Sequence, residues 1–178
     1  ATGRPTAAKS LRWVKRSMDV LGSAFFLLMT SHILLAAMIA IKLEDGGPIF
    51  FKQRRVGLNG EEFDCLKLRS MCVDAEARLA ELQAKNEGTG YLFKMKDDPR
   101  ITRVGKIIRR FSVDELPQLW NVFRGDMSLV GPRPALPKEV AQYDFDTRRR
   151  LRVRPGLTGL WQVSGRSRLS WEDTVRLD

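Results

Sequence analysis

Two adjacent carboxylates, Asp114 and Glu115, are the residues of this sequence best placed for chemistry, because they open a segment that also carries a rigidly held arginine. The segment is residues 112–134, SVDELPQLWNVFRGDMSLVGPRP. In a helix interior, neighbouring side chains point about 100° apart and cannot share one small site. At a helix start the geometry is looser, and the free backbone N–H groups attract carboxylates and phosphate alike. The pair therefore predicts a phosphate-handling site at a helix start.

The start of this helix has two registers. Either Ser112 is the N-cap and Glu115 completes a capping box, or Asp114 is itself the N-cap. Pro117 favours Asp114, since proline is tolerated in the first turn and is costly further in. A carboxylate at this position is expected to be ionised by the helix dipole. Ordinary helix capping explains the same two residues and stays open as an alternative.

Arg133 stands between two prolines in the run Gly131-Pro132-Arg133-Pro134. The run follows an apolar stripe at helical spacing, formed by Leu116, Leu119, Trp120 and Phe123. The prolines fix their own φ angles and disfavour helix at the residues before them. A rigid loop that presents a guanidinium suits bidentate phosphate recognition. The alternative is a structural ion pair with Asp126 or Glu139.

Composition narrows the partners of this chain. Its 178 residues carry a formal net charge of +10 and a pI near 10.1, which favours nucleic acid, acidic lipid or phosphorylated metabolites. The length fits one domain. Cys65 and Cys72 are too few for a disulfide framework or a zinc site, so buried thiols are expected. His32 is the single histidine, which excludes a serine–histidine triad in a soluble cleft.

Residues 20–41 form an uncharged, mostly apolar run that is long enough to cross a bilayer as a helix. The preceding basic segment carries Arg12, Lys15 and Arg16, which suit anionic lipid head groups. A signal peptide lacks a convincing cleavage site here, which leaves a spanning helix as the default. Cations on both flanks, however, satisfy the positive-inside rule only if the segment dips into the membrane and returns.

Residues 49–71 alternate as a β-hairpin does, with Asn59-Gly60 as a two-residue turn. Lys67 and Arg69 share one strand face and could grip a diphosphate, although a solvated face is the commoner explanation. Helices are expected over residues 74–86, 104–111, 116–123 and 137–152. The predicted fold class is α+β, mainly helical with a small β-hairpin.

Other candidate residues lie outside the central segment. Asp97 and Asp98 could bind magnesium, and a turn with a helix cap explains them equally well. Residues 148–152 include four arginines, which suit a solvated face, a helix C-terminus or lipid phosphates. Trp161 and Gln162 suit base stacking and hydrogen bonding, with core packing as the alternative for Trp161.

Several motifs, in order along the chain, resemble those of the bacterial sugar transferases, the monotopic polyprenyl-phosphate phosphoglycosyl transferases. The matching runs are KLRSM (67–71), RFSVDELPQL (110–119), GDMS (125–128), VGPRP (130–134) and RPGLTGLWQVSGR (154–166). Because they extend over about residues 15–173, chance is a poor explanation.

The resemblance implies a monotopic membrane protein with an N-terminal re-entrant helix. In the family this helix is kinked at a Ser-Pro pair, and here Ser31 and His32 occupy that place, so the membrane break is expected at these two residues. The implied organisation is a basic interfacial segment (1–19), a membrane re-entrant helix (20–41) and a cytosolic catalytic domain (42–178) that continues further in the family. The implied location is the cytoplasmic face of the bacterial inner membrane.

The implied reaction is transfer of a hexose 1-phosphate from a UDP-hexose, glucose or galactose, to undecaprenyl phosphate, as the initiating membrane step of exopolysaccharide or O-antigen synthesis. Asp114 would attack the β-phosphate, release UMP and carry the phosphosugar until the lipid phosphate removes it. Mg²⁺, bound by Asp114 and Glu115, would neutralise phosphate charge. Glu115 would either hold this metal or take a proton from the lipid phosphate.

The same resemblance assigns the remaining site residues and partners. Phosphate or nucleotide contacts are implied for Lys67, Arg69, Arg110, Arg133, Arg154, Gln162 and Arg166. Inner-membrane lipids and a second copy of the chain are implied partners, and nucleic acid is not.

Two other functions compete with this interpretation. A non-enzymatic, membrane-anchored basic module that binds anionic lipid or nucleic acid explains the charge and the apolar run, but not Asp114, Glu115 or the Pro-Arg-Pro turn. An aspartyl-phosphate phosphatase would share the nucleophile and need no lipid acceptor.

Overall fold

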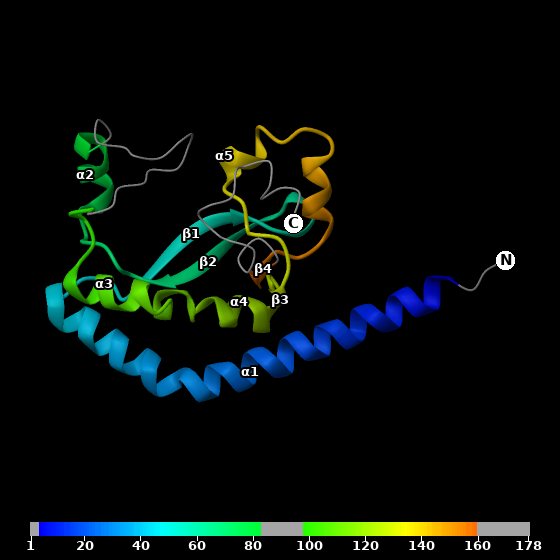
Figure 1. Ribbon diagram of the computed structural model, residues 1–178, viewed down its shortest axis with the longest axis horizontal. Coiled ribbons are helices and arrows are strands. Elements are labelled where there is room, and N and C mark those ends of the chain that lie inside the picture. Colours follow the sequence, from blue (N-terminus) through cyan, green and yellow to red (C-terminus); the bar gives the residue numbers. More distant parts are fainter. Residues whose placement is uncertain (1–3, 83–97, 160–178) are drawn as a thin grey trace. The chain divides into compact units, whose positions relative to one another are not determined.

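The first element of the computed structural model is helix α1 (Arg4–Asp45), 42 residues long (Figure 1). The structure describes residues 4–82 and 98–159. Pro5 is tolerated because it stands in the first turn, where its missing N–H costs nothing. Within α1, the stretch Ser10–Asp45 is long and apolar enough to cross a membrane by length and composition. The predicted segment 20–41 thus lies inside a longer helix, which also takes in most of the basic segment.

Helix α1 continues through Ser31 and His32, both of which are exposed. Histidine keeps its backbone N–H and lacks the ring that makes proline break a helix, so nothing in the covalent chemistry of this pair forces a kink. A re-entrant path stays a prediction.

Two compact units make up the chain. One comprises Ala1–Met29, Gln53–Cys65 and Gln118–Asp178, and the other comprises Thr30–Lys52 and Leu66–Pro117. Below, these are called the first and the second unit. Helix α1 and strand β1 (Phe50–Val56) contribute residues to both.

Strands β1 and β2 (Glu62–Leu68) form a two-stranded sheet, joined through the 3-10 turn η1 (Leu58–Gly60). Asn59 and Gly60 have φ of 58° and 85°, and Glu61 N donates to Leu58 O over 3.2 Å. Asparagine and glycine adopt positive φ at low cost, which confirms the predicted turn. Strand β2 ends earlier than residue 71, the predicted end.

The second unit packs around a core formed by Ala37 and Ile41 of α1, Leu68 of β2 and Ile108 of α3. Its other elements are α2 (Ala75–Leu82), α3 (Arg103–Arg110) and the 3-10 turn η3 (Val113–Glu115). Thr102 caps α3, its side chain accepting from Gly105 N over 2.9 Å. Glu44, near the end of α1, accepts from Arg103 N over 2.8 Å at the same helix start.

The first unit has a core of Phe63, Cys65, Val122 and Met127. Its elements are α4 (Gln118–Arg124), β3 (Ser128–Val130), α5 (Pro137–Val140), η4 (Thr147–Arg152) and β4 (Gly156–Thr158). Strands β3 and β4 are parallel, with Ser128 opposite Gly156 and Val130 opposite Thr158 (Figure 1).

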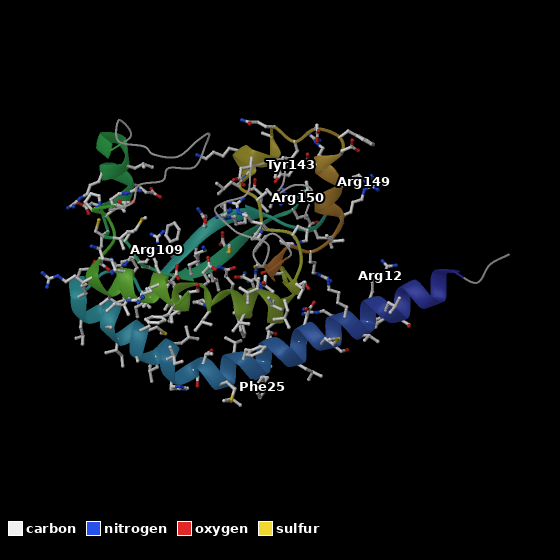
Figure 2. The ribbon with its side chains drawn as sticks, in the orientation of Figure 1. Arg12, Phe25, Arg109, Tyr143, Arg149 and Arg150 are labelled. Atoms are coloured by element: carbon white, nitrogen blue, oxygen red, sulfur yellow. The ribbon has the colours of Figure 1, made fainter. Side chains whose placement is uncertain are left out.

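The single helix predicted over residues 137–152 is wrong, because two short helices occupy this range. Helix α5 ends at Val140, and the Asp144 carboxylate accepts from Thr147 N over 2.8 Å, which starts η4. Tyr143 is buried between them, and the Arg150 guanidinium lies 5.7 Å from its ring centre (Figure 2). An aspartate whose carboxylate binds a backbone N–H three residues later competes with continuation of the first helix.

Polar residues in the N-terminal half of α1 bind backbone and side-chain groups of the first unit. The buried Asp19 carboxylate accepts from Ser128 Oγ and Leu129 N over 3.0 and 2.9 Å. Arg16 donates to the carbonyls of Val122 and Phe123 at the end of α4, over 2.7 and 2.6 Å. Lys15 Nζ donates to the carbonyl of Val130 in β3 over 3.2 Å. Lys15 and Arg16, predicted to face lipid head groups, therefore have protein partners here.

Candidate active site

Asp114 and Glu115 lie in η3, the turn between α3 and α4 (Figure 1). Ser112 has a left-handed φ of 56°, and its side chain makes no capping hydrogen bond. The turn is closed by backbone bonds from Glu115 N to Ser112 O and from Leu116 N to Val113 O, each 3.2 Å long. Ser112 thus stands at the N-cap position of η3 with Glu115 as the third residue, as one of the two registers predicts, but without the capping hydrogen bond. The other register is wrong, because Asp114 lies inside η3 and α4 begins only at Gln118.

The two carboxylates have different partners. Glu115 accepts a hydrogen bond from Lys67 Nζ of β2 at 2.8 Å. Asp114 is half-buried and forms no ion pair within residues 4–82 and 98–159. Within the part of the chain that the structure describes, Glu115 therefore has an ion-pair partner and Asp114 has none.

The environment of Asp114 raises the pKa of its carboxyl above the usual value. Burial is the main cause and the neighbouring Glu115 charge the second, while Lys67 and Arg109 act in the opposite direction. Burial disfavours the charged form because it removes water, and a like charge adds repulsion. The sequence predicted an ionised Asp114 because it placed this residue at the N-cap of a helix. Asp114 has no such position, so this reason for a lowered pKa does not apply.

Arg109 and Arg110 form the last turn of α3, and both are exposed. The charge of Arg109, which Figure 2 labels, lowers the pKa of the Asp114 carboxyl, although the motif did not single this residue out. The guanidinium of Arg110, the residue chosen from the motif, lies 5.7 Å from the Phe111 ring centre. A phosphate contact for Arg110 stays a prediction.

Arg69 is buried within the second unit, where it has protein partners on several sides. Its guanidinium binds both oxygens of Asp45 at the end of α1, the Pro48 carbonyl at 2.5 Å and the Met71 carbonyl at 3.2 Å. Lys67 and Arg69 were predicted to lie on the same strand face and to bind the same diphosphate. In the structure Lys67 binds Glu115, whereas Arg69 binds Asp45 at the end of α1. A phosphate contact for Arg69 stays a prediction.

Asp98 forms a buried ion pair with Arg100, with Oδ2 and Nη2 2.6 Å apart. Oδ1 also accepts from Arg100 N over 3.0 Å. Together with the Thr102 cap, these contacts build the turn that was one of the two explanations for Asp97 and Asp98. Asp97 lies outside the described residues.

The arginines predicted from the later motifs lie in the first unit. Arg133 Nη1 is 3.2 Å from Glu139 Oε2, so one of the two alternative ion pairs is formed. The other acid, Asp126, pairs with Arg124 at 2.8 Å. Arg154 is exposed, and its Nε donates to Gly125 O over 2.8 Å. Gln162 and Arg166 lie outside the described residues.

Asp114 and Glu115 are the residues that could hold a divalent cation. Within residues 4–82 and 98–159 there is no cluster of three or more histidine, cysteine, aspartate or glutamate side chains suited to a metal. Mg²⁺ is commonly bound by one or two carboxylates together with water and substrate phosphates. A pair of adjacent carboxylates fits such a partial site, in which the substrate supplies other oxygens.

Comparison with known proteins decides the family. Residues 10–178 match the family model described as bacterial sugar transferase. The chain belongs to this family. The motifs that suggested it, around Asp114 and Arg133, lie within the matched range.

Curated relatives of this bacterial sugar transferase come from several bacteria. The galactosyl transferase CpsE of Streptococcus agalactiae is 47% identical over 165 residues, which is 92% of this chain and 36% of that protein. The exopolysaccharide production protein ExoY of Sinorhizobium fredii is 46% identical over 92% of this chain and 74% of its own length. The undecaprenyl-phosphate galactose phosphotransferase of Salmonella typhimurium is 43% identical over 97% of this chain and 37% of its own length. The chain thus spans little more than a third of two of these relatives.

Proposed function

We propose that this bacterial sugar transferase moves a hexose 1-phosphate from a UDP-hexose to undecaprenyl phosphate and releases UMP. The observation that carries the proposal is the asymmetry of the carboxylate pair: Asp114 is half-buried without an ion pair in the described residues, beside a Glu115 neutralised by Lys67. Two relatives are named for such reactions, one of them a UDP-glucose:undecaprenyl-phosphate glucose-1-phosphate transferase of Caulobacter vibrioides that is 44% identical.

The reaction divides one displacement into two. An Asp114 carboxylate oxygen forms a bond to the β-phosphorus of the donor, and the bond from that phosphorus to the bridging oxygen breaks, so that UMP leaves with the electron pair. A phosphate oxygen of undecaprenyl phosphate then attacks the same phosphorus and displaces Asp114. The partial burial of Asp114 supports this role, because a partly desolvated carboxylate is a better nucleophile than a fully solvated one.

Glu115, Lys67 and Arg109 surround the nucleophile with defined charges. Lys67 fixes the Glu115 side chain, and Arg109 places positive charge near the point where phosphate negative charge must be accommodated. Magnesium, held by Asp114 and Glu115 when bound, would neutralise charge on the phosphate oxygens. Glu115 would assist either as its ligand or by taking the proton of the lipid phosphate.

The exposed apolar surface of α1 supports attachment to the inner membrane. Large exposed side chains between its two polar ends include Leu21, Phe25, Phe26, Leu28, Met29, Ile33, Leu35 and Ile39. An apolar surface of this extent on one helix is typical of membrane contact.

The charges on both flanks of the apolar run support a path that enters and leaves the membrane on the cytoplasmic side. Arg12, Lys15 and Arg16 precede the run, and Lys42 follows it. The positive-inside rule is met at both flanks only if the segment dips into the membrane and returns.

UMP release by the protein in lipid nanodiscs tests the proposed function. UDP-glucose and UDP-galactose are each supplied with magnesium, with and without undecaprenyl phosphate. Sustained release that requires the lipid and disappears in Asp114→Asn is the expected result. Binding of anionic vesicles without release from either donor would favour the non-enzymatic basic module, and lipid-independent turnover would favour a hydrolase.

A further inference from the structure

The end of β2 and the residue that follows it contact three other elements of the second unit. Leu68 packs in the core with residues of α1 and α3. Lys67, the residue before it, donates to a carboxylate oxygen of Glu115 in η3 over 2.8 Å. Arg69, the residue after it, binds Asp45 at the end of α1. Three consecutive residues thus connect the end of α1 with one of the two site carboxylates.

Arg69 makes its contact with α1 from a buried position. Its side chain is 7% exposed, and its guanidinium binds both carboxylate oxygens of Asp45, with Nη1 2.5 Å from Oδ2. Arg69 N also donates to Ile49 O over 2.8 Å. At Gly47, a Cβ atom would lie 2.9 Å from Nη2 of the guanidinium, so a larger residue there would displace it. The turn that follows α1 is therefore packed around this one side chain.

The guanidinium of Arg69 offers little to a ligand. Nε donates to Pro48 O over 2.5 Å, Nη1 to Asp45 and to Met71 O over 3.2 Å, and Nη2 to Asp45 again. Every nitrogen atom of the group thus binds a protein oxygen, and little of the side chain reaches solvent. Such a pair fixes the geometry around it, because two planar groups joined by two hydrogen bonds have one mutual orientation.

We propose that Arg69 is a positioning residue, which fixes the end of β2 against α1 and so keeps Lys67 in place to hold Glu115. This inference rests on the proposed function, since that function places Glu115 in the active site. Lys67 lies two residues before Arg69, with the buried Leu68 between them, so a shift of the chain at Arg69 displaces Lys67 as well. Arg69 therefore acts on Glu115 through the chain and does not touch the substrate.

Cross-linking by a water-soluble carbodiimide tests this role without requiring turnover. The reagent activates a carboxyl group, which a contacting amine attacks, so that an amide bond joins Lys67 to Glu115 without a spacer and is detected by peptide mass spectrometry. The side chains of Lys67 and Glu115 are 24% and 38% exposed, which lets the reagent reach them. The full chain in nanodiscs is used as wild type, Arg69→Met, Asp45→Asn and the double substitution.

Two further variants separate position from stability. Arg69→Lys keeps a charge for Asp45 and serves if the Met substitution destabilises the fold. Asp98→Asn is the matched control, because it breaks another buried pair of aspartate and arginine in the same unit, whose side chains are 7% and 6% exposed. UMP release from each donor is measured on the same samples, so that kcat and KM accompany every cross-link yield.

We expect the cross-link yield to fall about tenfold in Arg69→Met and in Asp45→Asn, because a buried pair that loses one partner rearranges. The loss should be smaller in Arg69→Lys and absent in Asp98→Asn. The yield in the double substitution should fall no further than in either single one. In the enzyme, kcat should fall while KM for the UDP-hexose stays nearly constant.

An unchanged cross-link in both single variants, or an equal loss in Asp98→Asn, would overturn the proposal, as would absence of the cross-link from the wild type. A rise in KM in Arg69→Met but not in Asp45→Asn would also overturn it, and would make Arg69 a substrate contact. A cross-link that depends on Arg69 in a protein that releases no UMP would contradict the transferase function and leave the link between Arg69 and Glu115 standing.

Discussion

The charge around Asp114 is set by three side chains with opposing effects. Burial and Glu115 raise the pKa of the Asp114 carboxyl, and Lys67 and Arg109 lower it. If Asp114 attacks as a carboxylate, activity falls when the pH drops through this pKa. The acid limb of the pH profile therefore reports the local charge balance.

Lys67→Met is predicted to move the acid limb of kcat/KM to higher pH, because it removes a charge that lowers the Asp114 pKa. Glu115→Gln removes a charge that raises it, so any residual activity should show the opposite displacement. The measurement is UMP release as a function of pH, with Lys106→Met on the exposed side of α3 as the control. Displacement of both profiles in the same direction would contradict the charge balance described here.

The buried pair of Asp98 and Arg100 belongs to stability and not to catalysis. Both side chains are at most 7% exposed, so Asp98→Asn leaves a buried guanidinium without its counter-ion. We predict a loss of about 3–5 kcal/mol in the free energy of unfolding. Denaturant unfolding in detergent measures it, with Asp74→Asn at an exposed pair as a control that should change little.

The pH dependence of this pair has a defined sign. Arg100, chiefly through its hydrogen bonds, lowers the pKa of the Asp98 carboxyl. The pair therefore stabilises the fold fully above the ordinary aspartate pKa and loses its effect as the pH falls through the lowered one. A stability difference between wild type and Asp98→Asn that grows as the solution is acidified would be the wrong sign.

At the scale of elements, the close approach of the parallel strands β3 and β4 depends on two glycines, Gly131 and Gly156. A Cβ atom on Gly156 would lie 2.1 Å from Gly131 N and 2.4 Å from Thr158 O, which are backbone atoms. Gly156→Ala is predicted to separate the strands and release the Arg133 loop, seen as rapid proteolysis and a lost unfolding transition.

Gly60→Ala is the control for this substitution. Gly60 has φ of 85° but open space around its Cβ position, so only backbone strain of about 1–3 kcal/mol is expected. Equal damage from both substitutions would show that close approach of the strands is not the cause.

Local sequence signals predicted some elements well and failed where tertiary contacts intervene. Asn59-Gly60 fixes the hairpin because both residues accept positive φ. The start of α4 was misplaced because a separate 3-10 turn, η3, opens at Ser112 with a positive φ and occupies Val113–Glu115, so that α4 begins only at Gln118. The alternation of residues predicted the strand that leads to Arg69. Its partner Asp45 is 24 residues away in the sequence, and a local pattern cannot predict such a pair.

At the scale of the whole molecule, we predict that both ends of α1 lie in the cytoplasm. Ser10→Cys and Leu43→Cys, each in a Cys72→Ser background, place a thiol on either exposed flank. A membrane-impermeant maleimide should label neither in intact cells and both after lysis. Labelling of one flank from outside would establish a spanning helix and contradict the return path.

Trapping of the covalent intermediate tests the central claim most directly. The protein is mixed with UDP-hexose carrying ³²P in its β-phosphate, without lipid acceptor, then denatured and digested. We predict one label per active chain, on the peptide that contains Asp114. The label should be lost when undecaprenyl phosphate is added before denaturation, and it should be absent in Asp114→Asn. Lipid-dependent transfer with no labelled protein, or label persisting in Asp114→Asn, would contradict it.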